Sequence, residues 1–520
     1  MSDTPAMKSL PYGDQGDGTY RNPVLYADYS DPDVIAVGAD YYMTASSFNC
    51  TPGLPVLHSR DLVNWRIIGY AMEAFPFESY RNPQHGKGVW APALRFYDGK
   101  FWIFFGAPDE GIFMTTAENP AGPWSPLHCV QEGKGLIDPC PFWDDDGQAY
   151  LVRAQAGSRC DGINSLLTLH RMAPDGTRLL DDGEVIVDGH WHHPTVEGPK
   201  LYKRNGYYYI FAPAGGVPGG WQTVFRSREI DGPYEDRIVL AQMSTPVNGP
   251  HQGAWVETVY GEHWFLHFQD KGHSGRILHL QPMEWGSDDW PLIGEPSPAR
   301  DVTQPVLRHA KPKSAEKTEP SRLPASDGFE GDSLGWQWQW MANSEDRWRE
   351  FVNPGLRLFC LGTSSGNQHW LEAANLLVQK PLDPEYAAEV EVDASNLRPG
   401  DRAGLLLTGA VWGGIYLERT EDGITALEAR LPSTAARELE VDGHRQLNGT
   451  KARLSLWLVD GVCRFAVSDQ SGEEHAVGLG IRPREAAWMG ARIGLFALSP
   501  GRSASGGSAV YRNFIYTPIC

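Results

Sequence analysis

The chain has 520 residues and a formal net charge of −20, with 41% hydrophobic and 21% charged residues. The length exceeds that of one ordinary hydrophobic core and predicts two domains. The acidic balance argues against nucleic acid or an anionic membrane surface as a partner, and no run of about 20 apolar residues is present that could span a bilayer.

Five segments in the first part of the chain share one pattern, in which a polar or aromatic residue opens a strand, a tight turn follows and an aromatic-rich strand returns. These segments begin at Asp31, Trp90, Asp138, Glu197 and His251. Hairpins repeated about every 50 residues are typical of a β-propeller with one copy per blade. We therefore predict an all-β chain in which residues 1–307 form a five-bladed β-propeller.

The second half of each unit adds another strand and turn and ends at an aromatic residue. Examples are His58–Trp65, Thr115–Trp124 and Phe225–Tyr234. This arrangement indicates four strands per blade. Helix signals are nearly absent along the chain.

Residues 308–324 contain charges, proline and serine without apolar periodicity, which is typical of a linker. Beyond them, short strands with alternating apolar residues, such as Ala452–Leu458, predict a β-sandwich over residues 325–520. The stretch Trp336–Trp340 holds three tryptophans. They either pack the sandwich against the propeller or fill the sandwich's own core, and we expect the two domains to be packed together.

Three of the five opening positions carry a carboxylate, namely Asp31, Asp138 and Glu197. Equivalent positions in different blades lie at equivalent distances from the axis, so we expect these side chains to converge. A single Asp-Pro at a strand start is more often a turn cap, but three carboxylates in phase favour a catalytic site. Carboxylates confined together acquire different pKa values, and glycoside hydrolysis needs such a division into acid and base.

Several motifs also follow one another in the order of one enzyme family. They are Asn22–Val24, Ser30–Asp33, Pro52–Trp65, Gly88–Pro92, Ile137–Pro139, Val196–Pro199 and Pro250–Gly253. In these residues the propeller half resembles glycoside hydrolase family 43, a family of five-bladed β-xylosidases and α-L-arabinofuranosidases. The remainder resembles the concanavalin-A-like sandwich that is appended to some xylosidases of that family.

The resemblance implies a role for each carboxylate. Asp31 matches the general base and Glu197 the general acid of an inverting enzyme, in which the base activates a water molecule. Asp138 matches the residue that tunes the pKa of the acid and orients it.

The resemblance also implies substrate and metal contacts. Trp90 matches a tryptophan that stacks on the sugar, and Phe48 matches a second hydrophobic wall. Arg276 matches an arginine near the acid or the sugar hydroxyls, with a salt bridge on a blade edge as the alternative. His251 matches a histidine near a calcium ion at the propeller centre. Because calcium prefers oxygen ligands, we expect His251 to contact a hydrated ion or a substrate hydroxyl, or else to be a hydrogen-bonded core residue.

The predicted function is that of an exo-acting glycosidase removing terminal α-L-arabinofuranose, β-D-xylose or both from plant-derived oligosaccharides. The chain departs from the commonest xylosidase pattern at Tyr26–Ser30 and around Cys50. These departures leave open which terminal sugar is removed. One alternative is a non-catalytic carbohydrate-binding propeller, which would not need three carboxylates in phase. Another is a fructosidase or a glycoside phosphorylase. A phosphorylase would need clustered basic side chains for phosphate, and no such cluster is seen near the opening positions.

The seven cysteines have no metal-type CxxC spacing, and the first residues include no apolar segment of signal-peptide length. We therefore expect free thiols and a cytoplasmic location. The expected partner is the oligosaccharide substrate, and the oligomeric state is left open.

Overall fold

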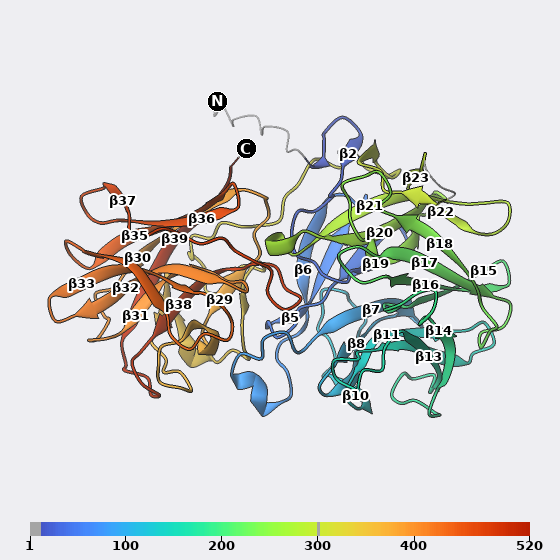
Figure 1. Cartoon of the computed structure of the whole chain (residues 1–520), viewed down its shortest axis with the longest axis horizontal. Coiled ribbons are helices and arrows are strands. Elements are labelled where there is room, and N and C mark those ends of the chain that lie inside the picture. The colour runs from blue at the N-terminus through green and yellow to red at the C-terminus, as the bar shows by residue number, and fades with distance from the viewer. Residues whose placement is uncertain (1–11, 299–301, 520) are drawn as a thin grey trace.

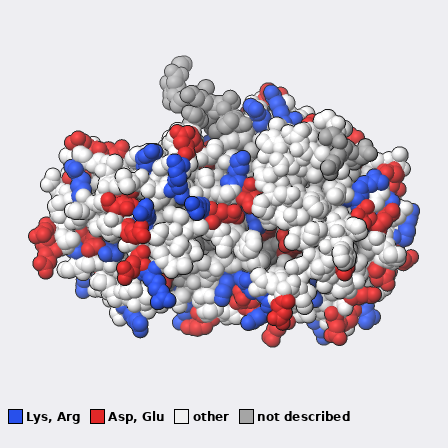
Figure 2. Space-filling model, in the orientation of Figure 1, with Lys and Arg blue, Asp and Glu red and all other residues white. Residues whose placement is uncertain are grey.

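The computed structural model describes residues 12–298 and 302–519, and it consists almost entirely of β-strands. Two lobes lie side by side, a blue-to-green propeller and an orange-to-red sandwich (Figure 1). Acidic and basic side chains are interspersed over both lobes on the face drawn in Figure 2. The net charge of −20 is therefore not gathered into one acidic patch on that face.

Five antiparallel four-stranded sheets form the blades, and within each sheet the strands pair in chain order. The first two blades contain β3 (Asp33–Val37), β4 (Asp40–Thr44), β5 (Gly53–Ser59) and β6 (Trp65–Met72), then β7 (Trp90–Tyr97), β8 (Lys100–Ala107), β9 (Gly111–Ala117) and β10 (His128–Glu132). The third contains β11 (Leu136–Trp143), β12 (Ala149–Gln155), β13 (Leu166–Met172) and β14 (Glu184–Asp188). The last two contain β15 (Lys200–Arg204), β16 (Tyr207–Ala214), β17 (Trp221–Ser227) and β18 (Glu235–Ala241), then β19 (His251–Glu257), β20 (His263–Asp270), β21 (Arg276–Trp285) and β22 (Pro291–Ile293).

The tight turns of the repeat follow from its residue types. Asp98-Gly99 joins β7 to β8 and Asn205-Gly206 joins β15 to β16, and all four residues have φ between 49° and 73°. Two successive residues at positive φ form a turn whose twist matches that of the flanking strands. Asp-Gly and Asn-Gly adopt this turn at the least steric cost, which explains why the hairpins close at these positions.

The blades form a closed ring. Strand β3 contacts β7, β7 contacts β11, β11 contacts β15, β16 contacts β19, and β19 returns to β3. Leu25 exchanges backbone hydrogen bonds with Leu278 of β21, which ties the start of the ring to its last blade. The predicted five-bladed propeller is confirmed, and the first strand of each blade lies nearest the axis.

Two small sheets accompany the ring. One joins β1 (Gly13–Asp14), β2 (Thr19–Arg21) and β25 (Arg308–Ala310), and the other joins β23 (Glu295–Pro296) and β24 (Thr303–Gln304). Along the whole described chain there are four short 3-10 helices: η1 (Glu78–Arg81), η2 (Gly272–Ser274), η3 (Asp346–Trp348) and η4 (Trp370–Glu372). Within 12–298 and 302–519, no helix has the length and apolar character needed to cross a membrane.

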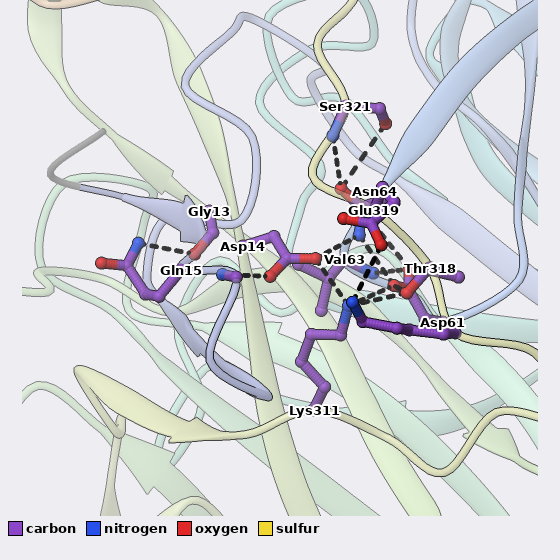
Figure 3. Close-up of polar contacts among 12 residues, drawn as sticks. Gly13, Asp14, Gln15, Asp61, Val63, Asn64, Lys311, Thr318, Glu319 and Ser321 are labelled. Atoms are coloured by element: carbon purple, nitrogen blue, oxygen red, sulfur yellow. Dashed lines mark hydrogen bonds and ion pairs between the residues drawn. The ribbon is translucent and has the colours of Figure 1, made fainter. Parts of the chain in front are cut away.

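The segment that follows β25 is fixed to the first blade by a polar cluster (Figure 3). The Lys311 ammonium group pairs with the carboxylates of Asp14 and Asp61, and its distance to Asp61 Oδ2 is 3.0 Å. Asn64 donates to Asp14 Oδ2 over 2.7 Å and accepts the backbone N–H of Ser321 over 2.9 Å. Residues 311–321 are thus held against the propeller at both ends, which limits how far the second domain can move.

The second domain is a sandwich of two seven-stranded sheets, which confirms the predicted class. In spatial order, one sheet contains β26 (Gln339–Trp340), β29 (Leu377–Gln379), β38 (Ile493–Leu498), β31 (Arg402–Leu407), β32 (Trp412–Thr420), β33 (Gly423–Leu431) and β34 (Glu440–Gln446). The other contains β27 (Arg349–Phe351), β28 (Leu356–Phe359), β39 (Ser508–Pro518), β30 (Tyr386–Asp393), β35 (Lys451–Val459), β36 (Val462–Ser468) and β37 (Glu474–Ala476).

The sandwich packs directly on the propeller. One cluster of buried apolar side chains continues from the propeller into the sandwich, for example from Tyr29 to Leu405. Thr51 and Trp340 exchange two backbone hydrogen bonds of 2.9 and 2.6 Å across the boundary. The opening tryptophans divide their roles: Trp338 and Trp340 are buried in this shared core, whereas Trp336 is 53% exposed.

Candidate active site

Each blade has a residue with a left-handed backbone at or close to the start of its first strand. These residues are Asp31 (φ 53°), Ala91 (34°), Asp138 (56°), Gly198 (56°) and Gln252 (34°). The register of β7, β11 and β19 also shifts near these positions, as expected for β-bulges, which re-aim side chains next to active sites.

The carboxylates do not all occupy the same step of this repeat. Asp31 and Asp138 stand at the left-handed position itself, whereas Glu197 stands one residue before it, at the place that Trp90 takes in the second blade. Relative to the left-handed residue, the two aspartates thus stand at the position itself, and Glu197 stands one residue before it, as Trp90 and His251 do. Since that offset turns a side chain in a different direction, the backbone aims Glu197 differently from the aspartates.

Asp31 is almost completely buried and is surrounded by donors. Arg276 Nη1 donates to its Oδ1 over 3.0 Å, while the hydroxyls of Ser30 and Ser46 donate to its Oδ2 over 2.8 and 2.6 Å. Ser46 is itself placed by the N–H of Ala91, which donates to its hydroxyl over 2.7 Å. An arginine and two hydroxyls around one carboxyl group suit its ionised form, and they hold it in one orientation.

Asp138 and Glu197 lie close enough to Asp31 for its negative charge to raise their pKa values. Burial, followed by the negative charge of Asp31, raises the pKa of Asp138 to about 7. Burial, followed by the charges of Asp138 and Asp31, raises the pKa of Glu197 to about 8. Asp138 Oδ2 accepts the N–H of Gly198 over 2.7 Å, so the second carboxylate is bonded to the residue next to Glu197. The structure thus brings the three carboxyl groups close enough for their charges to act on one another, and the raised pKa of Glu197 favours its protonated form.

His251 lies beside the glutamate at the propeller centre. Its side chain is completely buried, and its Nε2 is 3.5 Å from Glu197 Oε1. Burial and the charge of Arg276 lower its pKa to about 3, so the ring is neutral. Neither ring nitrogen has a hydrogen-bond partner among the described residues, which fits contact with an ordered water molecule or the water shell of an ion.

A direct protein cage for a metal does not fit this site. In the described part of the chain, no group of three or more His, Cys, Asp or Glu side chains is arranged to hold a metal ion. Calcium requires six to eight oxygen ligands, and His251 supplies only nitrogen. A calcium ion at this position would therefore have to keep most of its water.

The predicted sugar-contacting residues lie at different depths. The indole of Trp90 is partly exposed, and the Arg159 guanidinium lies over it at 5.7 Å. Phe48 is only 2% exposed and packs in an apolar cluster that includes sandwich residues. Arg276 is bound to Asp31 and lies over the ring of Phe268 at 4.9 Å. Of these two aromatic residues, only Trp90 is exposed enough to contact a sugar. Phe48 is buried and packs beneath the surface of the site.

A segment of the sandwich, residues 485–491, completes the surroundings of the site. Trp488 packs edge-on against Trp90 with 5.8 Å between ring centroids, and the Arg276 guanidinium lies 5.7 Å from the Trp488 ring. The N–H of Ala491 donates to the carbonyl of His273 over 2.7 Å, which holds the segment on the propeller. The second domain thus supplies an aromatic side chain beside the carboxylates.

Sequence reasoning missed several of these residues. Gln252 Nε2 donates to Asp138 Oδ2 over 3.5 Å, and its place directly after the fifth opening position is a signal that could have identified it. Ser46 lies in the irregular segment that follows β4, and Trp488 is remote from every propeller motif, so no local pattern identifies either as part of the site.

Comparison with known proteins agrees with this architecture. The model of glycosyl hydrolases family 43 matches residues 20–291, and the model of the β-xylosidase C-terminal concanavalin A-like domain matches residues 326–517. The chain is 42% identical over 421 residues to a protein of Xylanibacter ruminicola provisionally named a β-xylosidase, covering 79% of this chain and 75% of that relative.

The chain is also similar to a curated arabinofuranosidase and to a crystal structure of a family 43 protein. A non-reducing end α-L-arabinofuranosidase of Bacteroides ovatus is 32% identical over 365 residues, which cover 65% of each chain. The crystal structure of a mutant family 43 protein from Bacillus licheniformis superposes with a TM-score of 0.83 at 26% identity, covering 96% of this chain and 99% of that one. Together with the matching family model, these similarities show that the chain belongs to glycoside hydrolase family 43 and is a glycoside hydrolase.

Proposed function

We propose that the protein is an exo-acting glycosidase that removes terminal α-L-arabinofuranose, β-D-xylose or both from plant-derived oligosaccharides with inversion. The observation that carries this proposal is the contrast between two carboxyl groups. Glu197 has a pKa raised to about 8, whereas Asp31 is surrounded by an arginine and two hydroxyl donors. One group suits proton donation and the other suits proton acceptance, as inverting hydrolysis requires.

In the proposed reaction, Glu197 donates its proton to the glycosidic oxygen as the bond to the anomeric carbon breaks. A water molecule attacks that carbon from the opposite face and transfers a proton to Asp31. The products are the free pentose and the shortened oligosaccharide, and proton exchange with solvent restores both carboxyl groups. Asp138 contributes through its charge, which keeps the pKa of Glu197 high, and through its bond to Gly198, which fixes the glutamate's backbone.

Exo action is supported by the sandwich segment 485–491. Trp488 stands against Trp90, and a sugar stacked on Trp90 would meet this second indole at its edge. Such a wall would close one end of the site to a continuing chain and admit a terminal residue. The names of the β-xylosidase and arabinofuranosidase relatives support the choice of pentoses.

Calcium and the cellular location remain proposals. A calcium ion would contact His251 through its water shell and add positive charge near the carboxylates, while the proton transfers described above use only the protein's own groups. A cytoplasmic location would suit short oligosaccharides better than insoluble polymers as substrates.

The test is a panel of aryl pentosides and hexosides, with the anomer released from the preferred substrate followed by NMR. We expect release from α-L-arabinofuranosides, β-D-xylosides or both, with the inverted anomer formed first. Asp31→Asn should abolish release, and Asp40→Asn, at the hairpin that joins β3 to β4 at their ends away from Asp31, is the matched control. Binding of oligosaccharide without release would support the carbohydrate-binding alternative, and dependence on inorganic phosphate would support the phosphorylase alternative.

A further inference from the structure

The loop that carries Glu197 also carries the most exposed tryptophan among the large apolar residues described. This loop joins β14 to β15, and the Trp191 side chain within it is 89% exposed. Isolated exposed apolar residues are common on protein surfaces. Trp191 differs because it lies six residues before the proposed acid, which limits its distance from Glu197 to roughly 20 Å even for a fully extended chain.

The loop is held rigidly at both sides of Trp191. The N–H of Gly189 donates to the carbonyl of Ser165 over 2.8 Å, and the N–H of Thr195 donates to the hydroxyl of the same serine over 2.8 Å. His193 is buried and contacts Asp236 Oδ2 over 2.9 Å. The backbone is therefore anchored to the blades, while the indole between these anchors projects into solvent.

The neighbouring loop, residues 156–165, lies between the Trp191 loop and Trp90, and it contacts both. Its Arg159 lies over the ring of Trp90 and pairs with Asp109 over 3.2 Å. Its Ile163 is 46% exposed and lies two residues before Ser165, the anchor of the Trp191 loop. Two adjoining loops thus present apolar side chains to solvent. One of them, residues 156–165, also contacts Trp90 through Arg159.

The proposed role of Glu197 as general acid indicates which part of the substrate lies near these two loops. A general acid must reach the oxygen that joins the terminal sugar to the leaving group, so the leaving group lies next to Glu197. The terminal sugar occupies the space between the carboxylates and Trp90. The leaving oligosaccharide must then extend outward, past the loop that bears Glu197 and Trp191.

We propose that Trp191 forms a leaving-group subsite in which its indole stacks on a neutral pyranose ring of the departing oligosaccharide. This inference rests on the proposed hydrolytic function and adds a residue that selects the leaving group. An exposed flat indole offers apolar contact to the C–H face of a pyranose, and no charge on the sugar is needed. The subsite serves whichever terminal pentose is removed, because an arabinofuranose side group and a terminal xylose can both be attached to xylopyranose units.

The test compares substrates that share a terminal sugar and differ in the leaving group. Trp191→Ala, Trp191→Phe and the wild-type protein are assayed on an aryl pentoside and on xylotriose and xylotetraose, or on arabinosylated xylotriose if arabinose is the sugar released. Trp336→Ala is the matched control, because it removes another exposed indole that the sandwich places beside Tyr70. Melting temperature and size-exclusion volume are recorded for each variant.

Trp191→Ala should lower kcat/KM on the oligosaccharides about three- to tenfold, mainly through KM, and leave the aryl pentoside within twofold. Trp191→Phe should recover most of the loss, and Trp336→Ala should change neither substrate. An equal loss on both substrates, or no loss on either, would overturn the subsite. A changed elution volume for Trp191→Ala without a change in kcat/KM would assign the indole to contact between copies instead. If the wild-type protein releases no sugar from any of these compounds, the proposed function itself fails, which is a distinct result.

Discussion

Asp28 of the propeller and Arg492 of the sandwich form a buried ion pair, with 2.8 Å between Oδ2 and Nη2 and 2% exposure of each side chain. The same carboxylate accepts the N–H of Gly490 over 3.0 Å and the N–H of Arg276 over 2.9 Å. Arg276 in turn holds Asp31. A single carboxylate therefore links the second domain to the backbone of the residue that orients the proposed base.

This link predicts a coupled loss of stability and activity. Arg492→Met leaves Asp28 charged and unpaired, and breaking a buried pair in this way costs about 3–5 kcal/mol. The variant should unfold at a lower urea concentration and show a lower kcat/KM, because Arg276 loses a fixed neighbour. Arg430→Met is the control, since Arg430 pairs with Glu440 at an exposed site and such pairs contribute about 0–1 kcal/mol. Equal effects of the two substitutions would contradict the link.

The proposed acid role of Glu197 predicts a dependence on the leaving group. Glu197→Gln removes the donated proton, and general acid assistance contributes about 10²–10⁴-fold to the rate. Release from an oligosaccharide should therefore fall by about that factor, while release of an activated nitrophenolate, which leaves without protonation, should fall far less. Steady-state rates on both substrates test this, with Glu284→Gln on the exposed side of β21 as the control. The same loss on both substrates would remove Glu197 from this role.

The raised pKa of Glu197 predicts where activity is lost at high pH. The acid must be protonated, so kcat/KM should fall as the pH rises through about 8. The charge of Asp138 is one of the causes that raise this pKa, so Asp138→Asn should lower it and move the basic limb to lower pH. A pH profile of kcat/KM for the two proteins measures the shift. An unmoved or higher basic limb in Asp138→Asn would show that Asp138 does not tune the acid.

The same shift predicts a pH-dependent change in stability. The pKa of Glu197 rises from 4.5 to about 8 on folding, so the folded protein binds the extra proton between these values. Stability from this group is fully present below about pH 4.5 and is lost as the pH rises towards 8. Glu197→Gln cannot ionise, so its melting temperature relative to the wild type should be higher at pH 8 than at pH 5. A difference that stays constant across this range would contradict burial of the ionisable group.

The sequence by itself determined the propeller, the sandwich and the approximate place of the carboxylates. Asp98-Gly99 and Asn205-Gly206 close hairpins through their own conformational preferences, so the repeat could be recognised from local turn chemistry. Asp31 and Asp138 follow the five-fold phase because the backbone has the same left-handed conformation at both.

Only the tertiary structure decided the high pKa of Glu197 and the part played by the second domain. The pKa depends on burial and on the charges of Asp138 and Asp31, which are distant in the chain. Arg492 and Asp28 are separated by 464 positions. Such contacts leave no periodic trace, because they are set by the way two finished domains pack and not by the conformational preferences of neighbouring residues.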